Sequence, residues 1–344
     1  MKSHQLGVIA CVAMGVCQMT ASSAKAEETR TFAFQDRPGQ TLDVLCDGKI
    51  VGRYMYAYDT STPDKKNETY KPYLHVFDAE GKAPITKGPG GEYTHHRGIL
   101  IGWMKIGYNG KSYDRWHMKG GEQVHQKFSA QKADADQATF TSTVNWNDEA
   151  GKPIIEEART MTFRRAPAPA YVMIDFSSTI KAPNGDITLD GDPEHAGIQF
   201  RPANEVDRTK TAYTFPGEKV DAHKAKDLAW IGETFSLNGK TYSVVDMNHP
   251  GNPKDTKISA YRNYGRFGMF PTAKIKAGES ATFNYRFLVA EGGMPPSAVI
   301  QNICNAYTGQ SAPAPAALTV KPAEQPAPPK AKEPKKDAKK TGTK

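Results

Sequence analysis

The 344-residue sequence predicts an all-β protein, a large antiparallel β-sandwich, supersandwich-like in size, with one C-terminal helix. Short runs of β-branched and aromatic residues recur along the chain, and Asn-Gly turn signals separate several of them. Only one segment has the apolar spacing of a helix. Hydrophobic residues make up 38% of the chain, which is enough for a core and excludes a globally disordered protein. The sequence does not distinguish a sandwich from a barrel-like arrangement of these strands.

The first 26 residues have the pattern of a secretory signal peptide. Residues 1–5 are polar with one lysine, residues 6–19 are apolar, and Ala24-Lys25-Ala26 is a small-residue cleavage site. The apolar run is too short to cross a bilayer comfortably as an anchor. We therefore expect cleavage after Ala26 and a periplasmic or secreted mature protein without a transmembrane segment.

The strands are predicted by alternation and by turns. Two hairpins are expected around an Asn-Gly pair: residues 99–108 and 111–116 around Asn109-Gly110, and residues 231–237 and 240–245 around Asn238-Gly239. Further strand-like runs are residues 139–146, 153–163, 171–180, 198–201, 266–270 and 281–289. No repeat or linker interrupts residues 27–310, so we expect them to form a single β-sandwich domain.

The expected helix covers residues 297–307. Pro295-Pro296 precede it and Gly309 follows it, which are typical start and stop signals. Its large apolar residues fall on one helical face: Val299, Ile300, Ile303 and Tyr307.

Residues 311–344 read as a disordered Pro/Ala/Lys-rich tail. They contain no aromatic residue and too little apolar surface to offset the entropy of ordering. A solubilising spacer is one interpretation, and a cationic tether to an anionic envelope surface is the other.

The formal charge of +8 does not predict a nucleic-acid partner. Residues 311–344 hold eight lysines against three acids, and residues 1–26 hold two lysines and no acid. The remaining body carries only +1. The basic tail also lacks interleaved aromatic residues, so we expect no nucleic-acid binding.

Cys46 and Cys304 are the cysteines that remain after the expected cleavage. In an oxidising compartment an even pair can form a disulfide. Two separate buried thiols explain the same sequence equally well.

Four loops gather residues suited to binding or catalysis. The glycine-rich loop 90–98 leads into a strand and carries His95, His96 and Arg97, which could bind a metal, a carboxylate or sugar hydroxyls. We expect His96 and Arg97 to be functional and His95 to be a packed side chain. The other three loops hold Glu122 and His125, Glu194 and His195 before a strand ending at Arg201, and His249.

Other enzyme classes leave no trace in the sequence. There is no G-x-S-x-G elbow, P-loop or dinucleotide fingerprint, and no close histidine spacing of a metal motif. A divalent metal remains possible, but the sequence assigns it no ligands.

Several motifs occur in the order seen in one family. They are Lys71-Pro72-Tyr73-Leu74-His75, His95-His96-Arg97-Gly98, the Asn109-Gly110 hairpin, residues 194–201 and residues 246–253. Over roughly residues 40–290 the chain resembles the PmoA-like family of secreted bacterial proteins, whose "methane oxygenase" label is borrowed from a membrane enzyme. The resemblance implies a large β-sandwich, export, and site positions at His75, His96, Arg97, His195, Arg201 and His249.

The leading functional hypothesis is an exported carbohydrate-active enzyme: a hydrolase, lyase or epimerase acting on a polysaccharide or oligosaccharide. The expected catalytic residues are His96, Arg97, His195, His249, Arg201 and Glu122. The expected substrate-binding residues are His75, Tyr93, Trp103, Trp116, His125 and Glu194. A hydrolase with two opposed carboxylates would draw on Glu122, Asp192, Glu194 and Asp246. The alternatives are a His-ligated metal-dependent oxygenase or hydrolase, and a non-catalytic glycan-binding protein.

Overall fold

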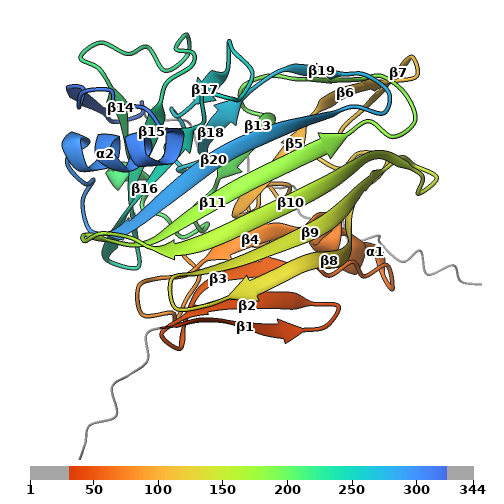
Figure 1. The fold of residues 1–344 in the computed structure, drawn as a ribbon, viewed down its shortest axis with the longest axis horizontal. Helices are drawn as coiled ribbons and strands as arrows, with labels where there is room; N and C mark the ends of the chain where they lie inside the picture. The colour runs from red at the N-terminus through yellow and green to blue at the C-terminus, as the bar shows by residue number, and fades with distance from the viewer. Residues whose placement is uncertain (1–30, 324–344) are drawn as a thin grey trace, which may run out of the picture.

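The computed structural model describes residues 31–323, so the expected signal peptide and most of the expected tail lie outside the described part. Within it the chain forms three sheets, two α-helices and one 3-10 turn, η1 (Arg208–Lys210) (Figure 1). Every strand pair within these sheets is antiparallel, as alternation and tight turns predict. The predicted all-β fold is confirmed.

Two large sheets form the sandwich. In spatial order, the first contains β1 (Phe32–Arg37), β2 (Thr41–Cys46), β3 (Lys49–Met55), β4 (Tyr73–Val76), β5 (Ile99–Trp103), β13 (Ala196–Phe200), β18 (Phe267–Phe270) and β17 (Lys257–Ser259). The second contains β21 (Ala317–Val320), β14 (Ala212–Pro216), β15 (Trp230–Leu237), β16 (Lys240–Asn248), β20 (Ser280–Glu291), β11 (Ala170–Lys181), β10 (Pro153–Arg165), β9 (Gln137–Asn147) and β8 (Gln123–Ala133).

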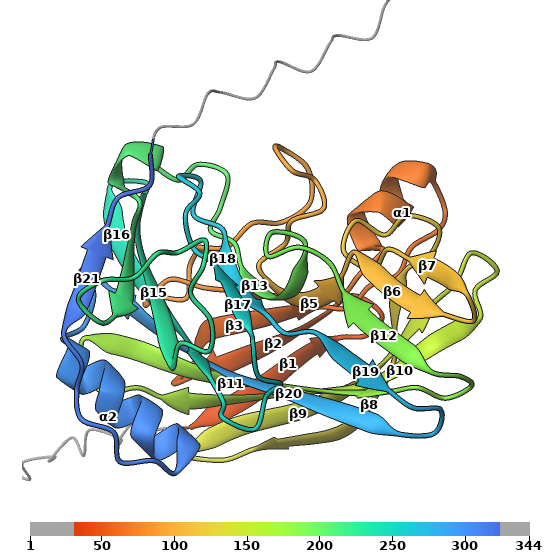
Figure 2. The same ribbon diagram turned by 90° about the horizontal axis from the view of Figure 1, so that it is seen from above.

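A third, smaller sheet lies beside the sandwich (Figure 2). It contains β19 (Ala273–Ile275), β12 (Ile187–Asp190), β6 (Lys105–Tyr108) and β7 (Lys111–Tyr113). The predicted strand 99–108 is therefore split at Met104 into β5 and β6, which belong to different sheets. Asn109 and Gly110 adopt positive φ angles of 49° and 73°, as the expected hairpin turn requires.

The main core lies between the two large sheets. Residues on the inner faces of both sheets form one apolar cluster, in which Ile99 and Ile101 of β5 join Phe140 of β9. Leu100 lies between those isoleucines in sequence, so the period-two alternation turns it to the opposite face of the sheet. That outer face of the eight-stranded sheet carries the histidine-rich loops.

The two helices flank the sandwich. The predicted helix is α2 (Ser297–Thr308), and its Ile300 and Cys304 pack on the outer face of the nine-stranded sheet against Trp230 (Figure 2). A second short helix, α1 (Pro63–Thr69), was not expected from its apolar spacing because it has no buried residue. Its signal is the Thr62 N-cap, which accepts a hydrogen bond from the Lys65 amide.

Part of the expected tail is an ordered strand. Ala317–Val320 forms β21, an edge strand paired with β14, so disorder from residue 311 onward is wrong for this stretch. Leu318 and Val320 favour a strand, and the unpaired edge of β14 supplies backbone partners.

The two cysteines of the described residues do not form a disulfide. Cys46 and Cys304 are both free thiols, in β2 and α2, so the separate-thiol interpretation holds.

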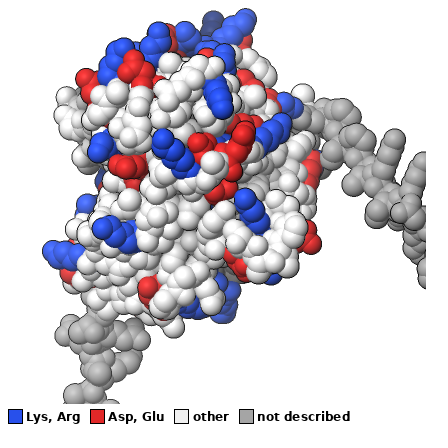
Figure 3. All heavy atoms as spheres, turned by 90° about the vertical axis from the view of Figure 1, so that its right-hand side faces the viewer, with Lys and Arg blue, Asp and Glu red and all other residues white. Residues whose placement is uncertain are grey.

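Acidic and basic side chains are mixed over the face drawn in Figure 3, in keeping with a nearly neutral body. None of the helices in residues 31–323 is both long and apolar enough to cross a membrane.

Candidate metal centre

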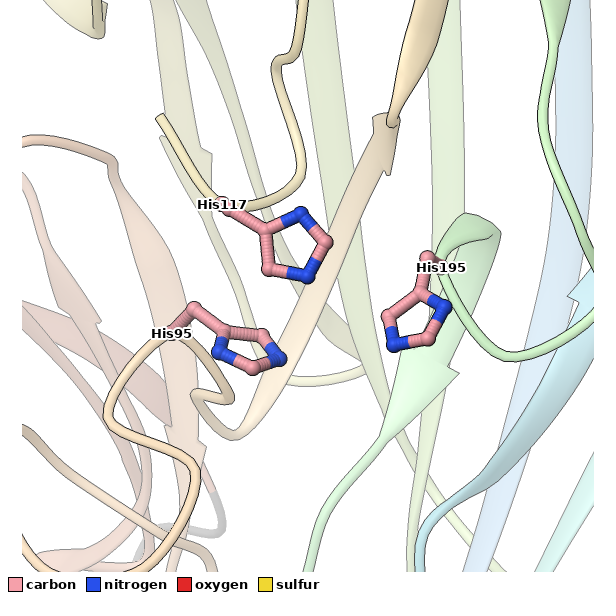
Figure 4. A group of neighbouring side chains, drawn as sticks. All are labelled: His95, His117 and His195. Atoms are coloured by element: carbon pink, nitrogen blue, oxygen red, sulfur yellow. The ribbon is translucent and has the colours of Figure 1, made fainter. Parts of the chain in front are cut away.

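Three histidines from three separate loops meet above the eight-stranded sheet. His95, His117 and His195 each offer a ring nitrogen, and these three atoms lie within 4.8 Å of one another. Figure 4 shows the three rings turned toward a common space. All three side chains are partly buried, and imidazole nitrogen is a common ligand of zinc and other late transition metals.

His117 is positioned by a turn centred on Asp114. The Asp114 Oδ1 accepts hydrogen bonds from the backbone amides of Trp116 at 2.9 Å and His117 at 2.8 Å. The other carboxylate oxygen lies 2.8 Å from His117 Nδ1. Holding Nδ1 in this way leaves Nε2 of the ring free to bind a ligand.

His195 is positioned in the same manner by Asp192. The Asp192 Oδ1 accepts from the Glu194 amide at 2.8 Å and lies 2.9 Å from His195 Nδ1. The His195 carbonyl accepts from the Met104 amide, which ties the turn to the end of β5. Two of the three histidines therefore have a carboxylate on Nδ1, the arrangement that orients imidazole ligands in metal sites.

His95 and His96 come from the long loop between β4 and β5. A turn closed by the His96 amide on the Tyr93 carbonyl presents both rings, with centroids 4.3 Å apart. The loop then runs past Gly98, where a Cβ atom would lie only 2.1 Å from the Leu74 carbonyl oxygen. Any side chain at that position would push the loop off the sheet.

A small apolar layer forms the floor of the site. Tyr73, Leu100 and Trp116 are almost fully buried and pack together on the outer face of the sheet. The Trp116 ring lies edge-on to His96 at 6.3 Å and to His195 at 6.4 Å between centroids. This layer limits the space in which the imidazole rings can move.

Burial and neighbouring charges keep the rings of His95 and His96 neutral. Burial lowers the pKa of His95 to about 2, and Lys71 and His117 add to the effect. Burial, followed by Arg266, also holds the pKa of His96 well below its usual value. Neutral imidazole is the form that binds a metal.

Two hollows meet at the histidines. The smaller, of about 120 Å³, is lined by Tyr93, His95, His96, Glu194, His195, Arg262 and Tyr264. The larger, of about 830 Å³, shares His95 and is also lined by His117 and Arg97. A ligand bound at the three rings could therefore extend to either side.

The His96 imidazole ring has no hydrogen-bond partner within the described residues. Both of its ring nitrogens are buried and unpartnered, although the residue lines the smaller hollow. Burying a polar group without a partner is costly, so these nitrogens are suited to contact a bound molecule.

The structure brings six of the expected positions together around this site: His96, Arg97, His195, Tyr93, Glu194 and Trp116. Trp116 is 0% exposed and supports the site rather than lining it. Glu194 forms an ion pair with Arg262. Arg201 lies one layer behind, buried with its guanidinium 4.8 Å from the centre of the Tyr264 ring. His95, expected to be a packed side chain, belongs to the cluster instead.

His249 is not part of this cluster. Its ring lies 5.3 Å from that of Tyr307 on α2, and that helix covers the nine-stranded sheet. Its loop follows a different sheet from the other candidate loops, which is why it is placed elsewhere.

Three other expected residues are also separate from the three histidines. His125 packs between Tyr56 and Phe128, and Glu122 forms an ion pair with Lys66 of α1. His75 contacts Thr86 and Tyr73.

Trp103 cannot stack on a ligand, so this expectation is wrong. It is 0% exposed, and its indole nitrogen donates to the Pro271 carbonyl inside the sandwich.

The expected carboxylate pair is also not assembled. Asp192 holds His195, Glu194 holds Arg262, and Asp246 is fully buried in β16. These acids already have partners or lie in the core, so they do not form two opposed groups around a substrate.

His117 was missed by sequence reasoning, although a signal exists. An acid stands three residues before each clustered histidine: Glu92, Asp114 and Asp192. The same spacing precedes His125 and His249, which lie elsewhere, so the pattern alone does not identify the site.

Comparison with known proteins gives a family and distant structural likenesses. Residues 41–303 match the model described as "Family of unknown function (DUF6807)". No curated protein matches the sequence.

Among solved structures, a galactose mutarotase related enzyme from Lactobacillus acidophilus is 8% identical, with a TM-score of 0.34 over 76% of this chain and 97% of that one. A galactose 1-epimerase from Lactobacillus acidophilus NCFM is 9% identical, with a TM-score of 0.31 over 76% and 94%. A β-arabinopyranosidase is 8% identical, with a TM-score of 0.35 over 70% of this chain, which spans 38% of that protein. The names of these three proteins refer to carbohydrates, but likenesses this distant carry no argument about the present site.

Proposed function

The chain belongs to the DUF6807 family of unknown function, and from its site we propose that it is a divalent-metal-dependent hydrolase acting on a carbohydrate. His95, His117 and His195 are the metal ligands in this proposal. The observation that carries it is their mutual approach within 4.8 Å, from three loops far apart in sequence. The His95 Nε2 is buried without a hydrogen-bond partner within the described residues, which is costly unless something binds it.

The donor set favours a zinc-like ion. Three neutral imidazoles, two of them oriented by Asp114 and Asp192, resemble the ligands of catalytic zinc, which keep a further position open. Non-haem iron oxygenases instead use two histidines and a carboxylate, and no carboxylate stands among the three ligands here. A bound ion of this kind would act as a Lewis acid and lower the pKa of a water molecule.

The surrounding residues suit a sugar. The rings of Tyr93 and Tyr264 lie 4.8 Å apart and line the smaller hollow together with His96. Aromatic faces pack on apolar ring faces, while the unpartnered His96 nitrogens can hold a hydroxyl group. In this proposal His96 positions the substrate and does not bind the metal.

Metal analysis and activity together test the proposal. The protein should be purified without an affinity tag, its metal content measured, and turnover screened on a glycan library with and without chelator. We expect one bound divalent ion per chain and turnover that chelator abolishes and added metal restores. Absence of stoichiometric metal after incubation with zinc, copper or iron would contradict the proposal.

Two matched variants sharpen the test. His117→Ala should lose both metal and turnover, whereas His249→Ala, on the opposite sheet, should keep both. Glycan binding that persists in His117→Ala, with no turnover in either protein, would instead favour the non-catalytic glycan-binding alternative.

The proposal includes export of the protein as well as a carbohydrate partner. The N-terminal pattern supports a periplasmic or secreted protein, and the resemblance to the PmoA-like family supports the same location. Fractionation of cells that express the full chain, with N-terminal sequencing of the mature protein, tests cleavage after Ala26.

A further inference from the structure

The Arg97 guanidinium is buried beside the three histidines without a negative partner, close to Lys71, whose pKa burial holds well below its usual value. Lys71 is 2% exposed and its Nζ donates to the Trp116 carbonyl at 2.5 Å. Arg97 is 1% exposed and donates to the carbonyls of His96 at 3.0 Å and Asn67 at 3.2 Å. Within residues 31–323 neither side chain forms an ion pair. Carbonyl oxygens satisfy the N–H groups but do not neutralise the charge.

One buried arginine of this chain does have an acidic partner. Arg159, also fully buried, has the Glu157 carboxylate at 2.8 Å. A buried charge normally needs such a partner, because removing it from water is expensive. Within the described residues, Arg115, Arg201 and Arg266 are buried with carbonyl or hydroxyl partners and no acid as well. Arg97 differs from these arginines because it also lines the larger hollow, where a negative partner from outside the protein could reach it.

The nearby acids do not fill this role. Asp114 is held by His117 and by two backbone amides. Glu68, at the rim of the larger hollow, forms an ion pair with Lys65 at 2.9 Å. Asp64 lines the same hollow but is exposed.

Arg97 lies where a negatively charged ligand could reach it. The larger hollow, about 830 Å³, is lined by Arg97, His95 and His117 and has Lys119 at its edge. A molecule held at the histidines could thus reach Arg97 without leaving the hollow. Arg97 donates to the carbonyls of His96 and Asn67 and also contacts the Tyr70 side chain, whereas its Nε–H has no partner within residues 31–323 and remains for an anion.

We propose that the substrate carries an anionic group, such as the carboxylate of a uronic acid or a sugar sulfate, and that Arg97 binds it. This inference rests on the proposed function, because it assumes that the sugar is held at the three histidines. It adds the substrate class, which is acidic rather than neutral carbohydrate.

Three sugars with the same ring test the inference by calorimetry on the untagged protein, both zinc-loaded and metal-free: D-glucuronate, D-glucose 6-sulfate and D-glucose. We expect at least one anionic sugar to bind about tenfold or more tightly than glucose, since a hydrogen bond to a charged acceptor is stronger than one between neutral groups. The two anionic arms distinguish carboxylate from sulfate. Equal or undetectable binding of all three sugars would overturn the inference.

Variants assign the preference to Arg97. Arg97→Gln should reduce the preference for the anionic sugar by about tenfold or more, and Arg97→Lys should keep part of it. Arg164→Gln, a half-exposed arginine on β10, is the matched control and should change nothing. If Arg97→Gln does not fold, Arg97→Lys and Lys119→Gln carry the test, and an undiminished preference in both would overturn the assignment.

The same data separate the two proposals. A protein that binds no metal but still prefers the anionic sugar contradicts the metal-dependent function and supports the anion site. A protein that binds metal without this preference does the reverse.

Discussion

The Nδ1 atom of His117 lies 2.8 Å from Oδ2 of Asp114, three residues earlier in the chain. Asp192 repeats this relationship with His195 at 2.9 Å, in an unrelated loop. A carboxylate on one imidazole nitrogen fixes the tautomer and makes the other nitrogen a better electron donor. The two pairs therefore give the cluster a directed set of ligand atoms.

We predict that Asp114→Asn weakens zinc binding by about 10–100-fold, the usual effect of removing such a partner. The asparagine side-chain oxygen can still accept the Trp116 and His117 amides, so the turn should persist. Competition with a chromophoric chelator measures the affinity. Asp186→Asn, which breaks only the exposed pair with Lys276, is the control. Unchanged zinc affinity in Asp114→Asn would remove the aspartate from the site.

Much of the fold could be predicted because its signals are local. Ala170–Lys181 alternates buried and partly exposed residues along its whole length, so period two identifies β11 directly. The Asn238-Gly239 turn between β15 and β16 is also readable from two adjacent residues. The strand Ala317–Val320 was missed because its stability comes from pairing with β14, far away in sequence.

The site was only partly predictable because its geometry is not local. β5 and β13 are antiparallel neighbours, with Ile99 opposite Phe200 and Ala196 opposite Trp103. His95 and His195 therefore leave from opposite ends of this pair, and the loop before β5 must fold back across it. No residue pattern near either histidine in the sequence indicates that this loop folds back.

His75 should make the stability of the protein depend on pH. Its pKa is lowered to about 4, mainly by burial and then by the charges of Arg53 and Arg97. In the unfolded chain an imidazole has a pKa near 6.5, so between these values only the unfolded state takes up the proton. The stabilisation is fully present above about pH 6.5 and is lost as the pH falls toward 4.

Urea unfolding between pH 4.5 and 7.5 measures this effect, with His75→Gln as the comparison. We expect the free energy of unfolding of the natural protein to fall by about 2 kcal/mol more than that of the variant over this range. The difference between the two proteins isolates His75 from the other histidines. Parallel pH profiles would show that His75 titrates alike in both states.

The buried pair of Glu157 and Arg159 should be the most sensitive ionic contact in the sandwich. Both side chains are 0% exposed, and the Glu157 carboxylate also accepts from Trp146 and Ser178. Arg159 reaches the Pro72 carbonyl at 2.9 Å, next to the floor of the histidine site. Losing one partner leaves the other charge without compensation inside the core.

We therefore predict that Glu157→Gln lowers the free energy of unfolding by about 3–5 kcal/mol. Glu156→Gln, one residue away, breaks only a half-exposed pair with Lys181 and should cost less than about 1 kcal/mol. The double variant Glu157→Gln/Arg159→Met removes both charges, so it should be less destabilised than the sum of its single variants. Urea titration of the natural protein, the single variants Glu157→Gln and Arg159→Met, and the double variant completes this double-mutant cycle. Additive losses would mean that the two charges do not compensate each other, and that the cost comes from the hydrogen bonds of Trp146 and Ser178 instead.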